Sequence, residues 1–234
     1  MVDEKTPASQ TLSRGIRILE VLADAREPLT IDDIARRLDV HRSVAYRLLR
    51  TLEDHGLVAR DGNGRIALGA RMAALAAGVA HDLQAEALPE LTDVANELGM
   101  TCFLSVLDHA ECVTLASVEP RHAVASVAQR PGTRHPVTRG APGKAILSLV
   151  PGASWPADAD TRLRDEVTDA AARGWFESHD EVVPSLRSVA VPLALRGRGA
   201  AAIAVVYLAS DHEPAEVAAR LARSAAVIRA ALGG

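Results

Sequence analysis

The apolar positions in the first third of the chain recur at the spacing of three successive helices. The stripe that we expect the first helix to bury comprises Leu12, Ile16, Leu19 and Ala23. A second helix is predicted to begin after Thr30, because Asp33 three residues later completes a capping box. A turn at Asp39-Val40 leads to a third helix, whose expected buried stripe comprises Val44, Leu48 and Leu52. Two short helices joined by a tight turn predict a helix-turn-helix.

The third helix is followed by the pattern of a short hairpin. Gly56 is the expected stop signal of the helix. Two short runs of strand-forming residues, 58–60 and 65–68, flank the sequence Asp61-Gly62-Asn63-Gly64, which is typical of a hairpin turn. Helix, turn, helix and hairpin in this order predict a winged helix-turn-helix, which we place at residues 9–69.

From residue 70 onward, small apolar residues and then alternating strands dominate the pattern. We expect a linker helix at 70–82 and a separate α+β domain at 83–234. The elements expected in that domain are a helix at 83–98, strands at 102–107, 112–117, 123–129, 188–195 and 200–208, a loop with a helix at 132–149, and a closing helix at 213–232. Residues 154–169 are polar and predict no regular element. The fold class is therefore mainly α in the first part and α+β with an antiparallel sheet in the second.

Charge is divided unevenly between these two parts. The formal net charge of −4 looks unfavourable for contact with nucleic acid, but residues 1–69 hold eleven basic side chains against eleven acidic ones, whereas 70–234 hold fifteen against nineteen. Between 41 and 65 there are five arginines and three carboxylates. Because attraction to phosphates is screened over about 8–10 Å, such a local basic patch is sufficient for DNA contact.

The residues that we expect to touch DNA lie on the outward face of the third helix and in the hairpin. The helix contributes Arg42, Ser43, Tyr46, Arg47 and Arg50, and the hairpin contributes Arg60, Asn63 and Arg65. A helix fits the major groove, so the helix residues are placed to read base edges and the wing residues to hold phosphates. The alternative is a sensor or enzyme whose winged helix makes protein contacts only.

Composition and cysteine placement indicate a cytoplasmic globular protein. No apolar run approaches the ~20 residues of a membrane helix, and no charged-then-apolar leader opens the chain. If His109 and Ala110 form a turn, Cys112 lies opposite Leu107 and Cys102 lies roughly opposite Ser117. The two sulfurs would then be too far apart for a disulfide. Two reduced, buried thiols fit a reducing compartment.

Sequence patterns that resemble catalytic motifs fail on their spacing. In TRGAPGKA, Thr138 stands where a phosphate-binding loop needs its first glycine, and Ala145 stands where it needs a hydroxyl. GNGRIA fits a loose dinucleotide pattern but lies in the hairpin, whereas such a loop must join a strand to a helix. We therefore expect no catalytic residue, no metal site and no cofactor.

Both halves of the chain resemble the IclR family of bacterial transcriptional regulators. The DNA-binding half resembles the family in RGIRILEVLA and LTIDDIARRLDVHRSVAYRLLRTLEDHGLVARDGNGRIALGARM, and the second half in PVTRGAPGKAIL and RGWFESHDEVVPSLRSVAVPL. The resemblance runs from about residue 9 to 232. It implies a GAF-like effector domain, homodimers or homotetramers, and binding to operator DNA in response to a small metabolite. Of the two directions of control, we favour repression of a catabolic or metabolic operon.

The resemblance also indicates where an effector would bind. Family members often hold a ligand carboxylate with backbone N–H groups that correspond here to Ala141 and Pro142, and Pro142 has no N–H to offer. The matching strand positions are Ser188, Ala204 and Val206. Because each unpaired polar group of a hydrophilic ligand on an apolar floor costs about 1–3 kcal/mol, we expect a small and rather apolar organic acid.

Two further features of the effector half leave alternatives open. Glu181 falls where the family usually carries a glutamate, and it either receives a donor from the ligand or caps a loop. Arg130, Arg134 and Arg139 lie near the ligand loop and either pair with a carboxylate or are simply solvated. Residues 150–173 are about a dozen residues shorter than in the family, so the covering of the pocket is expected to differ.

Overall fold

The computed structural model describes residues 9–25, 27–122, 127–195, 197, 199–208 and 212–233. The chain forms two compact units, Met1–Val79 and Ala80–Gly234. Among the described residues, no helix has both the length and the apolar character needed to cross a membrane.

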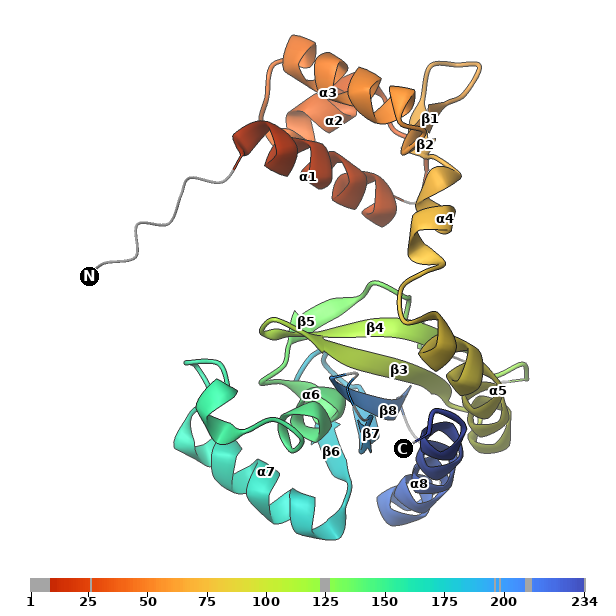
Figure 1. Cartoon of the computed structure of the whole chain (residues 1–234), viewed down its shortest axis with the longest axis vertical. Coiled ribbons are helices and arrows are strands. Elements are labelled where there is room, and N and C mark those ends of the chain that lie inside the picture. The colour runs from red at the N-terminus through yellow and green to blue at the C-terminus, as the bar shows by residue number, and fades with distance from the viewer. Residues whose placement is uncertain are drawn as a thin grey trace. The chain divides into compact units, whose positions relative to one another are not determined.

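The N-terminal unit is a three-helix domain with a two-stranded wing (Figure 1). Its elements are α1 (Gln10–Asp24), α2 (Ile31–Leu38), α3 (Arg42–Asp54), β1 (Val58–Arg60), β2 (Ile66–Leu68) and α4 (Arg71–Ala76). The predicted capping box is present: the Asp33 N–H donates to Thr30 Oγ1, and the Thr30 N–H donates to the Asp33 carboxylate. Asp61 stabilises the wing turn because its side chain accepts the N–H groups of Asn63 and Arg65 at 2.9 and 2.8 Å. The winged helix-turn-helix is thus confirmed.

The buried face of α1 differs from the predicted one. Gly15, Ile18 and Leu22 face the core, whereas Leu12 and Ile16 are 64% and 47% exposed. The helix carries two neighbouring apolar stripes, and the one that meets α2 and α3 becomes the core face. On α3 the inward face is centred one residue later than predicted: Ala45 and Leu49 are buried, and Val44, Leu48 and Leu52 are half-buried.

The single helix expected at 70–82 is interrupted. α4 ends at Ala76, and the next helix begins only at His81 after Ala80 adopts a left-handed conformation with φ of 45°. No residue of α4 is buried, so packing does not stabilise a continuous helix, and Gly78 lowers helix stability further.

The C-terminal unit is built on a six-stranded antiparallel sheet in the order β5-β4-β3-β8-β7-β6. The strands are β3 (Thr101–Asp108), β4 (Glu111–Val118), β5 (Arg134–Pro136), β6 (Phe176–His179), β7 (Arg187–Ala194) and β8 (Ala200–Tyr207). The helical segments are α5 (His81–Leu98), α6 (Gly140–Leu147), the 3₁₀ turn η1 (Gly152–Ser154), α7 (Thr161–Arg173) and α8 (Pro214–Ala231). The predicted α+β class with an antiparallel sheet is confirmed.

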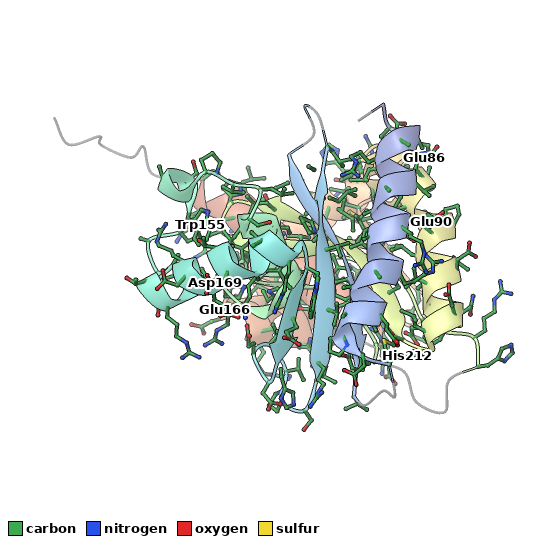
Figure 2. The ribbon with its side chains drawn as sticks, turned by 90° about the horizontal axis from the view of Figure 1, so that it is seen from below. Glu86, Glu90, Trp155, Glu166, Asp169 and His212 are labelled. Carbon is green, nitrogen blue, oxygen red and sulfur yellow. The ribbon has the colours of Figure 1, made fainter. Side chains whose placement is uncertain are left out.

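Helices cover both faces of this sheet and define two apolar clusters. Figure 2 shows strands between α7, which carries the labelled Glu166, and the pair α5 and α8 on the other side. Alternate residues of β7 and β8 face opposite clusters: Val189 and Val205 pack toward α5 and α8, and Ala190 and Ala204 pack toward α6 and α7.

Several elements differ from the sequence-based expectation, among them β6, a strand that was not predicted. The polar segment 154–169 contains the first part of α7, whose N-terminus is capped by Asp160. Of the strand expected at 123–129, residues 123–126 lie outside the described residues and 127–129 form no strand. The neighbouring edge strand is instead β5, which is only three residues long and contains a proline, so it offers little pattern to recognise.

The hairpin of β3 and β4 contains a bulge that corrects the expected position of one cysteine. The turn at His109-Ala110 pairs Cys112 with Leu107, as predicted. A register shift between Leu104 and Ser105 then places Cys102 opposite Val118 rather than Ser117, because a bulge adds one residue to one strand. Both thiols are free and buried.

Candidate functional site

The outward face of α3 carries exposed arginines. Arg47 and Arg50 are exposed, and within the described part of the chain neither guanidinium has a hydrogen bond or ion pair. Tyr46 lies beside them with 47% of its surface exposed. The inward packing of Ala45 and Leu49 turns these three side chains outward. A row of unpaired cations on a helix is suited to a polyanion such as duplex DNA.

The N-terminal end of α3 is more strongly ordered by internal contacts. Arg42 Nη1 donates to both carboxylate oxygens of Asp32 on α2, at 2.7 and 2.5 Å. His41 caps the helix, since its Nδ1 accepts the Ser43 N–H at 3.3 Å and lies 2.9 Å from the Ser43 hydroxyl. The pair Arg42 and Ser43 is therefore exposed but already oriented, unlike Arg47 and Arg50.

The three predicted wing residues have different surroundings. Asn63 is exposed at the tip of the turn. Arg65 is exposed and donates to the Pro28 carbonyl at 3.2 Å. Arg60 is only half-exposed and braces the wing internally, because it pairs with Glu53 of α3 at 3.5 Å and donates to the Gly64 carbonyl at 3.3 Å.

The C-terminal unit contains a cavity of about 60 Å³ on the α6 side of its sheet. Its walls are formed by Phe103, Gln129, His135, Gly140, Pro142, Ser178, Glu181, Val182, Val183, Leu186, Arg187, Ser188 and Val206. Of the predicted effector residues, Pro142, Glu181, Ser188 and Val206 reach this wall. Ala141 and Ala204 do not; both are fully buried in the cluster behind it.

The polar groups at this wall are paired with the protein itself. The Gly140 N–H donates to Glu181 Oε2 at 2.9 Å, and the Ala141 N–H donates to Ser178 Oγ at 2.9 Å. The Ser188 hydroxyl donates to the Val205 carbonyl at 2.7 Å. Among the outcomes foreseen for Glu181, the contact present here is a cap on the first N–H of α6.

Sequence reasoning missed several residues of this site. Lys144 is buried and its ammonium contacts the carboxylates of Glu166 and Glu181. A lysine in the otherwise apolar helix GAPGKAIL was the available signal. Ser178 lies on β6, a strand that was not predicted, and His135 lies on β5. Burial lowers the pKa of His135 below its usual value, which favours the neutral imidazole in the cavity wall.

The arginines proposed near the ligand loop do not line the cavity. Arg134 instead pairs with Glu111 at 2.7 Å and with Asp108, so it links β5 to the β3–β4 hairpin. Arg130 and Arg139 are exposed. Their roles are those of surface residues in this structure.

The described residues contain no cluster of three histidine, cysteine or acidic side chains that could hold a metal ion. Burial raises the pKa of the Cys112 thiol to about 12, and it also raises the pKa of Cys102. Thiols with raised pKa values are poor nucleophiles at neutral pH.

Comparison with known proteins gives the same assignment for both units. Residues 11–62 match the IclR helix-turn-helix domain, and residues 76–230 match the bacterial transcriptional regulator IclR C-terminal domain. A glycerol operon regulatory protein of Streptomyces griseus is 31% identical over 205 residues, covering 81% of this chain and 80% of the relative.

Two solved structures extend this likeness to the whole fold. An IclR transcriptional regulator from Alicyclobacillus acidocaldarius has a TM-score of 0.81 at 26% identity, covering 97% of this chain and 100% of that one. An IclR homologue from Microbacterium hydrocarbonoxydans, solved with 4-hydroxybenzoate, has a TM-score of 0.81 at 26% identity, with coverage of 95% and 99%. Such homologues are transcriptional regulators and not enzymes. The chain belongs to the IclR family and is a DNA-binding transcriptional regulator with an effector-binding domain.

Proposed function

We propose that this protein represses a catabolic or metabolic operon and that a small, rather apolar organic acid controls the repression. It would act in the cytoplasm, where bacterial operator DNA lies, as a homodimer or homotetramer. Residues 9–69 would bind the operator, 70–82 would form the linker, and 83–234 would form a GAF-like effector domain.

The observation that carries the DNA-binding proposal is the pair of unpaired arginines on α3. Arg47 and Arg50 lie on the outward face of the helix that enters the major groove in this class of domain. Arg42, Ser43 and Tyr46 would share base contacts with Arg47. Arg60, Asn63 and Arg65 would hold or position the wing on phosphates.

The effector proposal rests on the apolar part of the cavity wall. Phe103, Leu186 and Val206 supply apolar surface, and Val206 offers a small hydrophilic ligand no hydrogen-bond partner. The homologue solved with 4-hydroxybenzoate supports an aromatic acid as one candidate class. By binding one arrangement of the protein better than another, the acid would shift the population that fits the operator.

A gel shift on the upstream region of the protein's own gene tests this function. The purified protein should retard that fragment in preference to random DNA, and an acid that binds the cavity should change the retardation. Retardation only in the presence of a second protein would instead favour a winged helix that makes protein contacts.

A thermal-shift screen against metabolic acids identifies the effector class. Saturating ligand stabilises the folded state by a few kcal/mol, roughly 2.7 kcal/mol at a hundredfold excess over Kd. Stabilisation by glyoxylate-sized polar acids alone would overturn the apolar assignment.

A further inference from the structure

The N-terminus of α6 already holds a carboxylate that belongs to the protein. The Gly140 N–H donates to Glu181 Oε2 at 2.9 Å, the Ala141 N–H is taken by Ser178 Oγ, and Pro142 has no N–H. A helix N-terminus attracts anions because its free N–H groups and its dipole both favour negative charge. Here the first three positions of the helix have no N–H group left to offer.

The same carboxylate also neutralises a buried ammonium. Glu181 Oε1 lies 2.5 Å from Lys144 Nζ, and the Lys144 side chain is only 3% exposed. Glu166 of α7, labelled in Figure 2, contacts the same ammonium. A buried charge is stable only when it is paired, so Lys144 requires carboxylate at this place.

The Glu181 carboxylate lies at the effector cavity as well. Gly140, Pro142, Ser178 and Glu181 all belong to the cavity wall. At about 60 Å³ the cavity is small, since an apolar cavity of about 150 Å³ is the size that takes up benzene. An acid of aromatic size therefore needs additional space, and displacement of a wall side chain is the direct way to supply it.

We infer that the effector binds by carboxylate exchange: its carboxylate replaces that of Glu181 at the Gly140 N–H and the Lys144 ammonium, and Glu181 leaves the wall. This inference rests on the proposed function, because it assumes an acidic effector in this cavity. No covalent bond changes. The effector takes over the hydrogen bond and the ion pair that Glu181 gives up.

Charge balance favours exchange over simple addition. An effector carboxylate added beside Glu181 would place three carboxylates, including Glu166, around the single ammonium of Lys144. Like charges at such distances disfavour each other strongly. Exchange keeps two carboxylates on Lys144 before and after binding. Ser178 can assist, because its oxygen accepts the Ala141 N–H while its own O–H remains able to donate to the incoming group.

Glu181 thereby sets both affinity and specificity for the acid. It acts as an internal competitor that a ligand must displace, and it is part of the loop that carries Val182 and Val183 at the cavity wall. Displacement of Glu181 would move this loop. Effector binding would therefore be coupled directly to a conformational change.

Rescue by a small carboxylate tests the exchange without knowledge of the effector. In Glu181→Ala, sodium acetate should raise the midpoint of thermal unfolding saturably and beyond the rise given by sodium chloride at equal ionic strength. The wild type and Glu177→Ala, which removes an exposed carboxylate two strand positions before the loop, should show no such extra rise. Equal responses to acetate in all three proteins would overturn the inference. Should Glu181→Ala not fold, Glu181→Gln gives the same readout, because its neutral amide also leaves Lys144 short of a carboxylate.

Binding of an acid and its amide provides the second arm. 4-Hydroxybenzoate, or any acid that registers in the screen, should bind Glu181→Gln about tenfold more tightly than the wild type, equivalent to ~1.4 kcal/mol, because the internal competitor is gone. The matching amide should not gain. Weaker binding of the acid to Glu181→Gln would overturn exchange, since Glu181 would then be a partner of the ligand. If acetate rescues Glu181→Ala but no acid from the screen binds any variant, the effector proposal fails, whereas the carboxylate site at Gly140 and Lys144 stands.

Discussion

The two recognition regions of this protein treat their polar groups in opposite ways. On α3, Arg47 and Arg50 are exposed and unpaired in the described part of the chain. At the start of α6, the N–H groups of Gly140 and Ala141 are paired with Glu181 and Ser178. The guanidinium groups of the first region have no partner within the described part of the protein, whereas the N–H groups of the second region are already hydrogen-bonded to protein side chains.

This difference follows from the cost of leaving a group unpaired in each place. Exposed arginines are solvated by water, so they can stay free until phosphates displace the water and its counterions. The backbone donors of Gly140 and Ala141 are buried, and an unpaired buried donor costs about 1–3 kcal/mol. At the effector site the protein's own side chains therefore occupy the N–H groups, and a ligand must compete with these side chains.

The largest effect is expected from a substitution that tests how tightly α6 packs beside the effector cavity. A Cβ at Gly143 of α6 would lie 2.2 Å from the Val137 carbonyl oxygen. Gly143→Ala must therefore displace α6 away from Val137. We expect a loss of roughly 3 kcal/mol or more in the free energy of unfolding, measured in urea. The matched change on the DNA side is Gly62→Ala at the wing tip, where a Cβ meets nothing within 4 Å and the cost should stay within about 0.5 kcal/mol. Similar losses in the free energy of unfolding for the two variants would contradict the contrast between a tightly packed effector site and an open DNA-binding surface.

The second test separates base reading from phosphate binding on the open face. Arg47→Ala should weaken operator binding by about 1–3 kcal/mol while changing binding to random DNA much less. Arg65→Ala should weaken binding to both DNAs alike and lower the salt slope by about 1. Fluorescence anisotropy at several salt concentrations measures both. Equal losses on operator and random DNA for both variants would exclude a base-reading role for Arg47.

A smaller effect is expected at the N-terminal end of α3, where one arginine of the outward face already has a carboxylate partner. Asp32 holds Arg42 in an exposed ion pair, so Asp32→Ala should change stability by less than about 1 kcal/mol. Freed from its carboxylate, Arg42 should raise affinity for any duplex severalfold at low salt, about 1 kcal/mol by the scale of exposed pairs. Asp24→Ala, which removes an exposed carboxylate at the end of α1, controls for the change in net charge. The same gain in both variants would assign the effect to net charge alone.

The smallest expected effect concerns thiols on the two faces of the sheet. Burial raises the pKa of Cys112 to about 12 and raises that of Cys102, so at pH 8 both groups are protonated thiols with little access to solvent. Neither should react with an aromatic disulfide reagent until the protein is unfolded. Reaction of Cys112 in the native state would mean that the cavity side of the sheet opens to solvent. The description of the effector site as occupied by the protein's own side chains would then be wrong.

The sequence predicted element types well wherever one strong pattern was present. The capping box at Thr30, the wing turn at Asp61 and the turn before Cys112 were found because each depends on local chemistry. The buried face of α1 was not found, because two apolar stripes lie side by side and only the contact with α2 and α3 selects one. The bulge near Ser105 likewise leaves no clear signal in the residues themselves.

The effector site was predictable in position but not in its bonding. Family resemblance led to α6 and to the strand positions Ser188 and Val206, which do lie on the cavity wall. It could not reveal that Glu181 and Ser178 occupy the N–H groups, because those contacts join segments about 40 residues apart in the chain. Only tertiary structure brings such partners together.

The alternation of β7 and β8 between two clusters has an evolutionary consequence. Ser188 and Val206 face the effector cavity, while their neighbours Val189 and Val205 support α5 and α8. Because these alternate side chains point to opposite faces of the sheet and pack in different clusters, a change in one set does not directly alter the packing contacts of the other. A descendant of this protein can therefore acquire a new chemical signal by changing every second residue of these strands, while the scaffold that transmits the signal is inherited intact.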